Sequence, residues 1–520
     1  MTQITQLLRR AVQTAPHRIA SEFLGRSHTW LEFADRVARL AGALQGLGLS
    51  VGDRVGLLAL NSDRYLECLF AMPWGGFVVV PVNTRLAAPE IEFWLADSEC
   101  SALLVDETFA EVAASLKPQL PHLKHFVFLG EGATPERMLD YESLIGRAEP
   151  APDAGRGGDD LAAIFYTGGT TGRSKGVMVS HRNIVVNVQN TALALAGDAD
   201  TVYLHAAPMF HLADNAVNFV VTAVGGKHVF MARFDPGALL TLVAEKKVTA
   251  SLLVPTMINM IVNHPAVEAT DTSSLKRVIY GASPMPEAVI RRAFVALPHT
   301  SFVQAYGQSE AAPCMTFMYP DRHVVEGPKA GKIKSAGQAA IGCEIAILDV
   351  NGVEVPRGQV GEICGRGDNV MLGYWRQPEL TAAALRGGWL HTGDGGYMDE
   401  EGFVYVVDRM KDMIISGGEN VYSAEVEQAL YQHPAVAECA VIGVPDAKWG
   451  EAVHAVVRLK PGADANEQAL IAHCHALIAG YKAPRSVALR GEPLPLSGAG
   501  KILKTELRKP YWEGQERRVN

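Results

Sequence analysis

A short stretch between two apolar runs combines the residue types that bind oligophosphates. From Thr167 to Lys175 it holds glycines, threonines, a serine, an arginine and a lysine. Glycines let backbone N–H groups approach a phosphate, hydroxyl groups donate hydrogen bonds, and cations offset the anionic oxygens. The stretch therefore predicts a phosphate-binding loop, with a surface turn rich in Gly and Thr as the alternative when it is considered alone.

This stretch is not a P-loop, although it nearly matches one from Gly169. Ser174 stands where that motif has a glycine, and Gly176 stands where it has the hydroxyl that holds magnesium. Residues 176–180 predict a returning strand, and the next helix is expected to begin near His181. No helix N-terminus would then point at the phosphates, so a phosphate loop of another kind is the better interpretation.

Five further clusters carry side chains that could do chemistry. They are Pro208 to His211, Gln304 to Glu310, His391 to Gly395, Asp408 to Asp412, and Leu496 to Lys501. The second follows a predicted strand, and open α/β sheets bind ligands at the carboxyl ends of their strands. Each cluster also has a plain structural alternative, such as a capping histidine, a solvated acid, a β-turn, a charge run or a mobile loop. Six such loops in one chain favour a shared site.

Strand-like and helix-like segments alternate through most of the chain and must position these loops. This alternation predicts parallel sheets covered by helices, one before the phosphate loop and one after it. From Gly342 the pattern becomes all-β, with a hairpin turn at Asn351-Gly352. After Asp408 it predicts a small α+β unit of about a hundred residues. We therefore expect an α/β fold with two doubly wound sheets and a β-barrel-like subdomain in residues 1–408, and a small mobile α+β domain in 409–520.

Composition narrows the class of protein. The 520 residues carry a net charge of −9, which argues against a general nucleic-acid binder. Seven cysteines without a C-x-x-C pair indicate a reducing compartment and no disulfide framework. The N-terminus lacks the apolar core of a signal peptide, and the most apolar run, Cys68 to Val82, is too short to span a bilayer. We expect a cytoplasmic protein, and we expect no metal site at His473 to His475, since neighbours on a helix point to different sides.

Over essentially its full length the chain resembles the acyl-CoA synthetases of the adenylate-forming superfamily, which also holds aryl-CoA ligases, firefly luciferase and peptide-synthetase adenylation domains. Tyr166 to Gly176 resembles Y-T-S-G-T-T-G-x-P-K-G, Tyr306 to Glu310 resembles Y-G-x-T-E, and Thr392 to Asp394 resembles T-G-D. Asp408 to Glu427 is similar to the hinge motif of the superfamily, and Pro495 to Lys501 is similar to P-x-T-x-x-G-K.

Four positions depart from these motifs. Gly168 replaces a serine and Ser174 replaces a proline, which predicts a slower or more mobile phosphate clamp. Ser309 and Ser497 each replace a threonine and keep the hydroxyl group. We expect the activity to survive all four changes.

The resemblance implies a ligase that uses ATP, Mg²⁺ and coenzyme A to activate a monocarboxylic acid. A carboxylate and a phosphate about 4 Å apart repel by roughly 4 kcal/mol at an effective dielectric of about 20, so cations must lie where they meet. The resemblance implies that Lys175 and the threonines hold the β- and γ-phosphates, that Glu310 with Thr167 holds Mg²⁺, and that Lys501 bridges the α-phosphate and the carboxylate. Acyl-adenylate and pyrophosphate would then form through positioning and charge neutralisation.

The remaining nucleotide contacts are also implied by the resemblance. Gly281 to Ser283 and Tyr306 would bracket the adenine, Asp394 would accept from both ribose hydroxyls, and Arg409 would bond ribose or phosphate. The complete implied ATP- and AMP-binding set is Thr167, Gly168, Gly169, Thr170, Thr171, Gly172, Lys175, Gly281, Ala282, Ser283, Tyr306, Gly307, Ser309, Asp394, Arg409 and Lys501.

The second half-reaction, thioester formation with AMP release, needs a route for the thiol. The resemblance implies that the C-terminal domain rotates about a hinge at Lys411, withdraws Lys501 and brings Ser416 to Gly418 to a pantetheine tunnel. Trp449 resembles a residue at the entrance for CoA, with a half-buried interface tryptophan as the alternative. The residues implied as catalytic are Lys501, Glu310, His211 and Lys411.

The implied acyl pocket is mostly apolar and includes small residues, which favours an uncharged tail. Its residues are Phe210, His211, Asn215, Phe219, Gly281, Ala282, Ala305, Gly307, Ala312 and Met315. His211 follows Phe210 where amino-acid-activating relatives carry an aspartate, so an amino acid is not the expected substrate. A medium- or long-chain fatty acid is the first expectation, and an aryl or arylalkenoic acid of the coumarate or benzoate type is the second.

Other classes of function stay open from the sequence. They are a stand-alone adenylation enzyme that loads a carrier protein, a luciferase-type oxygenase and a non-enzymatic nucleotide sensor. We expect small-molecule partners and no nucleic acid or transmembrane segment. The sequence leaves open the acid, a dimeric state, peripheral membrane contact and which of the two conformations a structure would show.

Overall fold

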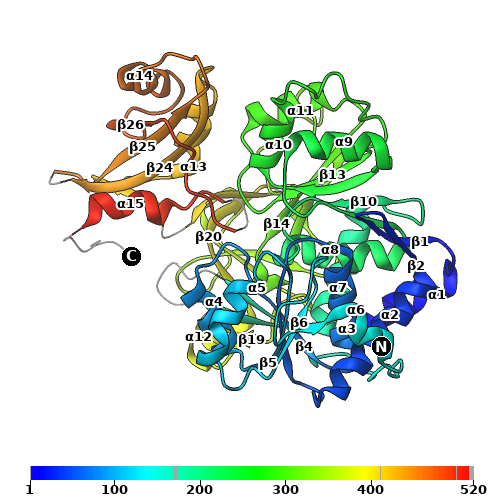
Figure 1. Cartoon of the computed structure of the whole chain (residues 1–520). Helices are drawn as coiled ribbons and strands as arrows, with labels where there is room; N and C mark the ends of the chain where they lie inside the picture. Colours follow the sequence, from blue (N-terminus) through cyan, green and yellow to red (C-terminus); the bar gives the residue numbers. More distant parts are fainter. Residues whose placement is uncertain are drawn as a thin grey trace.

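The computed structural model describes residues 2–167, 174–409, 412–417, 419–446, 448–498 and 501–513. Two large sheets with helices form the N-terminal part, and a small sheet with three helices forms a C-terminal lobe beside it (Figure 1). The predicted α/β fold class, with a large N-terminal part and a small C-terminal domain, is confirmed.

The first large sheet carries the phosphate loop. Its strand order is β19-β9-β8-β4-β3-β5-β6-β7. The strands are β3 (Arg54–Leu58), β4 (Val78–Pro81), β5 (Cys100–Val105), β6 (His125–Phe128), β7 (Leu139–Asp140), β8 (Leu161–Thr167), β9 (Lys175–Ser180) and β19 (Gly373–Tyr374). Strands β3 to β8 pair in parallel, whereas β9 runs antiparallel to β8 with Thr167 opposite Lys175. This register confirms the returning strand and the rejection of a P-loop.

The second large sheet brings two candidate clusters to one edge. Its order is β16-β15-β14-β13-β12-β10-β11-β1-β2. The strands are β1 (Ile19–Phe23), β2 (Arg26–Thr29), β10 (Val202–His205), β11 (Lys227–Phe230), β12 (Ala250–Leu253), β13 (Arg277–Gly281), β14 (Ser301–Gly307), β15 (Cys314–Met318) and β16 (Gln338–Ala339). Because β13 and β14 are parallel neighbours, Gly281 lies opposite Ala305, and the residues after both strands meet.

The helices of the large part cover these sheets and fill the space between them. They are α1 (Ile4–Thr14), α2 (Trp30–Gly46), α3 (Asp63–Gly75), α4 (Ala88–Asp97), α5 (Ala110–Leu116), α6 (Tyr141–Arg147), α7 (His181–Leu195), α8 (Leu212–Val224), α9 (Pro236–Lys246), α10 (Pro255–Val262), α11 (Glu287–Ala296) and α12 (Pro378–Ala384). Helix α3 is buried on nearly all sides and contacts β3 and β4 of the first sheet and β1 and β11 of the second. A helix buried all round belongs to a core between layers.

The part predicted to be barrel-like is a four-stranded antiparallel sheet with β17 and β21 at its edges. Its order is β17-β18-β20-β21, and the strands are β17 (Glu344–Leu348), β18 (Gly361–Arg366), β20 (Leu390–Met398) and β21 (Val404–Arg409). Strands β20 and β21 lead from the large part to the C-terminal lobe (Figure 1). Asp394 of the T-G-D motif, within β20, pairs with Arg409 at the end of β21, next to the start of the lobe.

The C-terminal lobe has a sheet and a hydrophobic cluster of its own. Its elements are β22 (Ile414–Ser416), β23 (Glu419–Val421), α13 (Ser423–Tyr431), β24 (Val436–Asp446), β25 (Gly450–Leu459), α14 (Glu467–Leu477), β26 (Ser486–Arg490) and α15 (Lys504–Trp512). A separate core lets a lobe move as a unit. Among the described residues, none of the helices is both long and apolar enough to cross a bilayer.

Candidate active site

Glu310 and Lys175, which come from different sheets, meet around one tyrosine. Glu310 lies in the short helix η2 (Ser309–Ala311) after β14, and its Oε1 accepts a hydrogen bond from the hydroxyl of Tyr374 at 2.9 Å. The Nζ of Lys175 lies 5.1 Å from the centroid of the Tyr374 ring. Burial, and next the charge of Glu310, raises the pKa of Tyr374 well above its usual value, so the hydroxyl keeps its proton. Tyr374 thus joins the lysine of the phosphate loop to the candidate magnesium ligand.

The predicted phosphate loop connects the antiparallel strands β8 and β9. Thr167 ends β8 and Lys175 begins β9, so the two lie opposite each other where the hairpin opens. The predicted phosphate ligands Gly168, Gly169, Thr170, Thr171 and Gly172 lie outside the described residues.

Asp394 is held between two predicted nucleotide ligands. Its Oδ2 accepts from the hydroxyl of Tyr306 at 2.8 Å, and its Oδ1 lies 2.9 Å from Nε of Arg409. Burial, and next the charge of Asp394, raises the pKa of Tyr306 well above its usual value. The ring predicted to bracket the adenine is therefore tied through its hydroxyl to the acid predicted to bind the ribose.

The T-G-D residues, Thr392 to Asp394, lie within strand β20, so the β-turn alternative was wrong; Glu362 of the neighbouring β18 anchors them. Its Oε1 accepts from the backbone N–H of Gly393 at 3.0 Å, and its Oε2 lies 2.7 Å from Nδ1 of His391. Cys364 completes a group of three candidate metal-ligand atoms that lie within 4.8 Å of one another. However, Arg386 also bonds Oε2 of Glu362 at 3.0 Å, so hydrogen bonding accounts for this cluster.

The predicted adenine-binding residues lie where β13 and β14 end. A Cβ atom at Gly281 would collide with the carbonyl oxygen of Ala305, so only glycine allows this close approach. Ala282 has a positive φ of +69°, and Ser283 follows it in the loop. Gly307 and Ser309 follow Tyr306 at the end of the neighbouring strand. The structure therefore brings the whole predicted adenine set to one edge of the second sheet.

The predicted acyl-pocket residues are largely buried. Phe210, Phe219, Ala312 and Met315 belong to the large hydrophobic cluster of the N-terminal part, and Ala305 packs against it. Asn215 is buried, and its Nδ2 donates to the carbonyl of Met209 at 2.9 Å, so its amide nitrogen is already used within the fold.

His211 caps helix α8, as its plain alternative in the sequence predicted. Its Nδ1 accepts from the backbone N–H of Ala213 at 3.4 Å. Burial, and next the charge of Lys501, lowers the pKa of His211 to about 4. The ring is therefore neutral at physiological pH and lies within electrostatic reach of a lysine from the other lobe.

Lys501, from the C-terminal lobe, lies within electrostatic reach of candidate site residues of the large part. Burial, and next the charge of Arg409, lowers its pKa to about 8, while Asp394 and Glu310 act in the opposite direction. These electrostatic effects show that Lys501 lies near the predicted nucleotide residues Arg409, Asp394 and Glu310. They also show that it lies near His211 of the predicted acyl pocket. An ammonium group there can offset two anions that approach each other.

The predicted CoA-binding residues meet within the C-terminal lobe. The backbone N–H of Gly417 donates to the carbonyl of Trp449 at 2.8 Å, and a Cβ at Gly417 would lie 2.5 Å from Cε3 of that indole. The indole also lies near Lys448 Nζ and the Arg485 guanidinium, 4.7 and 4.5 Å from its centroid. Ser416 is buried, and Gly418 and the predicted hinge residue Lys411 lie outside the described residues.

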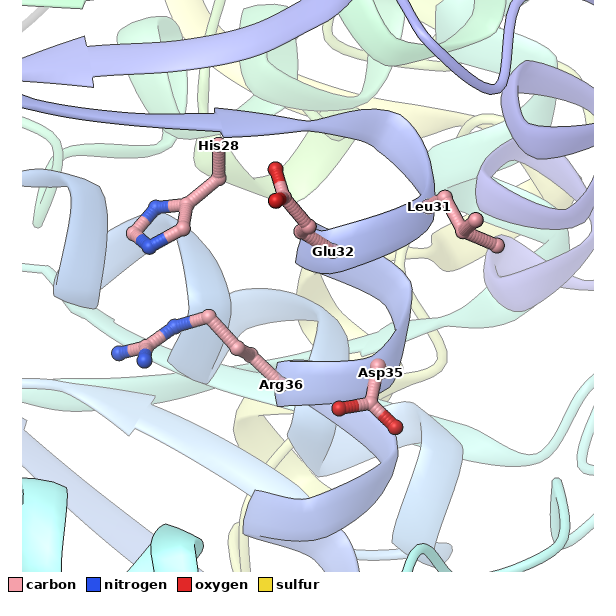
Figure 2. A pocket seen from close by; sticks show the side chains of 5 residues that line it. All are labelled: His28, Leu31, Glu32, Asp35 and Arg36. Carbon is pink, nitrogen blue, oxygen red and sulfur yellow. The ribbon is translucent and has the colours of Figure 1, made fainter.

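A surface pocket beside β2 and α2 is unrelated to these residues. Figure 2 shows its lining, which is His28, Leu31, Glu32, Asp35 and Arg36. Glu32 caps the start of α2 through Thr29, and Arg36 pairs with Glu67 at 2.6 Å. Glu32 and Arg36 of this pocket are therefore used in helix capping and in an ion pair within the fold.

Comparisons with known proteins agree with this arrangement. The sequence model of the family described as AMP-binding enzyme matches residues 8–375, and that of the AMP-binding enzyme C-terminal domain matches residues 425–501. A feruloyl-CoA synthase of Amycolatopsis sp. is 40% identical over 506 residues, with 96% of this chain and 98% of that protein covered. A medium/long-chain-fatty-acid–CoA ligase, FadD8 of Mycobacterium tuberculosis, is 35% identical over 515 residues, with 96% and 88% covered.

Among solved structures, the chain is similar to MatB from Rhodopseudomonas palustris in its ATP-bound form. The TM-score is 0.88 at 32% identity, with 98% of this chain and 99% of that one covered. The apo form of the same protein matches with a TM-score of 0.77. The present arrangement of the chain is therefore nearer to the ATP-bound one.

Proposed function

Because this chain belongs to the AMP-binding enzyme family and is an AMP-forming acyl-CoA ligase, we propose that it activates an arylalkenoic acid through an acyl-adenylate. The position of Lys501 carries the proposal for the chemistry, since a lysine of the C-terminal lobe interacts with acids from the nucleotide side of the large part. The 40% identity to a feruloyl-CoA synthase supports an aryl acid. A medium- or long-chain fatty acid is the second candidate, supported by FadD8.

In the proposed first half-reaction, the acid carboxylate attacks the α-phosphorus of ATP and pyrophosphate leaves. Lys501 lies between the two anions and lowers their repulsion, while Asp394 and Tyr306 hold the ribose and adenine. Lys175 offsets the charge of the departing phosphates. These residues bind and orient the reactants, and neutral His211 adds no competing charge beside the carboxylate.

Glu310 fits a magnesium ion. Its Oε1 bonds Tyr374, and its Oε2 has no hydrogen-bond partner within the described part of the chain. Carboxylate oxygens and substrate phosphates are the ligands that Mg²⁺ prefers. Glu310, with Thr167, would hold the ion, which would supply charge neutralisation at the phosphates.

For the second half-reaction we propose rotation of residues 409–520 against residues 1–408 about Lys411. Asp412 pairs with Arg508 at 2.7 Å within the C-terminal lobe, whereas Asp408 of the large part accepts from the backbone N–H of Ser423 of the lobe at 2.6 Å. The rotation would therefore have to break the Asp408–Ser423 hydrogen bond or carry Asp408 with the lobe. It would carry the Gly417–Trp449 surface to the adenylate, so that a thiol attacks the acyl carbon and AMP leaves. A cytoplasmic location stays a prediction from the sequence.

A panel of acids tests the proposed substrate. We expect ferulate and coumarate to give a kcat/KM for pyrophosphate release at least about tenfold above decanoate and palmitate, since complementary apolar contacts are worth about 1–3 kcal/mol. A fatty acid that exceeds both aryl acids would overturn the arylalkenoic proposal. A titration of CoA in the same assay separates a ligase from an enzyme that loads a carrier protein, since only the ligase releases AMP in response to CoA.

The pH dependence of adenylate formation tests the charge on Lys501. The lysine is active as the ammonium form, and its pKa of about 8 in the free enzyme lies below the usual 10.5. The kcat/KM for pyrophosphate release should therefore hold below pH 8 and fall as the pH rises through about 8, approaching tenfold per unit. Thioester formation from supplied acyl-adenylate should show no such fall. A flat profile for pyrophosphate release up to pH 10 would contradict a role for the ammonium group.

A further inference from the structure

Arg85 of the large part bonds the loop that carries Lys501. Arg85 lies between β4 and α4, and its Nη1 donates to the backbone carbonyl of Ser497 at 2.7 Å. The two residues are 412 positions apart, on opposite sides of the contact between the lobes. Within the described part of the chain, the guanidinium forms no ion pair with a carboxylate, and it donates to this carbonyl instead.

Asn83 packs against the same loop. A Cβ atom built on Gly498 would lie 2.5 Å from Nδ2 and 2.6 Å from Oδ1 of Asn83, which leaves no room for a side chain. The Oδ1 of Asn83 also accepts from the backbone N–H of Arg85 at 3.0 Å, so the two residues form one preshaped surface.

Ser497 in turn holds Lys501. Its Oγ accepts from the backbone N–H of Lys501 at 3.1 Å, and its own backbone N–H donates to the carbonyl of Lys501 at 2.7 Å. A bridge between Leu496 and Ile502 closes the base of the loop. Contacts therefore run without a break from Arg85 through Ser497 to the backbone of Lys501.

We propose that Asn83 and Arg85 form a docking surface for the Lys501 loop, and that Arg85 is a positioning residue for the first half-reaction. This inference rests on the proposed two-step function. Since the docking surface and the loop belong to different lobes, any rotation of the C-terminal lobe breaks the Arg85–Ser497 bond. The bond thus favours the arrangement in which Lys501 reaches the nucleotide, and it must open before the thiol enters.

The two half-reactions measured separately test this role. Arg85→Ala should lower kcat/KM for acid-dependent pyrophosphate release about tenfold, the size expected for one hydrogen bond from a charged donor. Thioester formation from supplied acyl-adenylate should be unchanged or faster, because the docked arrangement competes with it. Arg85→Lys should recover part of the loss, and Arg233→Ala, which removes an exposed arginine elsewhere in the large part, should change neither rate.

A second pair of variants tests the steric contact without removing a charge. Gly498→Ala should reduce adenylate formation by hindering docking, and Asn83→Ala combined with Gly498→Ala should recover part of it by making room. Equal loss of both half-reactions in Arg85→Ala, or full adenylation activity in that variant, would overturn the docking surface. If the unaltered enzyme forms no adenylate from any acid, the proposed function fails instead, so the two failures are distinguishable.

Discussion

Replacing Lys501 with alanine will abolish adenylate formation and leave thioester formation from supplied acyl-adenylate largely intact. In the proposed function, the ammonium group of Lys501 is the cation that would lie where the carboxylate and the α-phosphate meet, and it lies within electrostatic reach of Arg409, Asp394 and Glu310. Removal of one preorganised donor from a transition state costs about 100- to 1,000-fold in rate. The proposed second step would not need this group, because the proposed rotation would withdraw the lysine from the site.

The measurement compares single-turnover pyrophosphate release with CoA-dependent AMP release from synthetic acyl-adenylate. Lys509→Ala is the matched control, because Lys509 lies exposed on α15 and, within the described residues, forms its ion pair across one turn with Glu506. It should behave as the unaltered enzyme does in both assays. Equal loss of both steps in Lys501→Ala would count against alternation of the lobes.

Replacing Glu310 with glutamine will weaken the use of Mg²⁺-ATP. The change keeps the shape of the side chain and its contact with Tyr374, but it removes the negative charge that attracts the metal ion. We expect half-maximal activity to need at least about tenfold more Mg²⁺, the lower end of what loss of even an outer-sphere partner costs.

The test is a magnesium titration of pyrophosphate release at fixed ATP. Glu400→Gln, at an exposed acid in the turn between β20 and β21, serves as the control and should titrate as the unaltered enzyme does. Tyr374→Phe keeps the carboxylate of Glu310 and removes one hydroxyl group. Its increase in the Mg²⁺ concentration needed for half-maximal activity should therefore be smaller than that of Glu310→Gln. An unaltered magnesium dependence in Glu310→Gln would remove the metal role of this acid.

The arrangement of the main elements could be predicted because each rests on a local pattern. Short strand-like segments predicted the parallel strands β10 to β14, and the helix expected to begin near His181 is α7, which begins at that residue. Two-residue strands such as β19 carry no readable period, so the strand that holds Tyr374 was not predicted. The small antiparallel sheet was predicted as all-β, but closure into a barrel depends on contacts between distant strands.

The candidate site could be predicted motif by motif, but the contacts between motifs could not. Tyr374 bonds a residue 64 positions away, Glu362 bonds one 31 positions away, and Arg85 bonds one 412 positions away. None of these three residues lies in a sequence motif that predicts ligand binding, because each contacts another residue of the site. Proximity of this kind follows from the folded topology, and no local rule of composition or spacing contains it.

The most direct test of the central claim is exchange of labelled pyrophosphate into ATP by the unaltered enzyme with Mg²⁺ and without CoA. If Lys501 and the nucleotide residues form an acyl-adenylate reversibly, exchange will appear only when a suitable acid is present. The contradicting result would be an enzyme that still binds ATP but shows no exchange with any of a broad set of aryl and fatty acids.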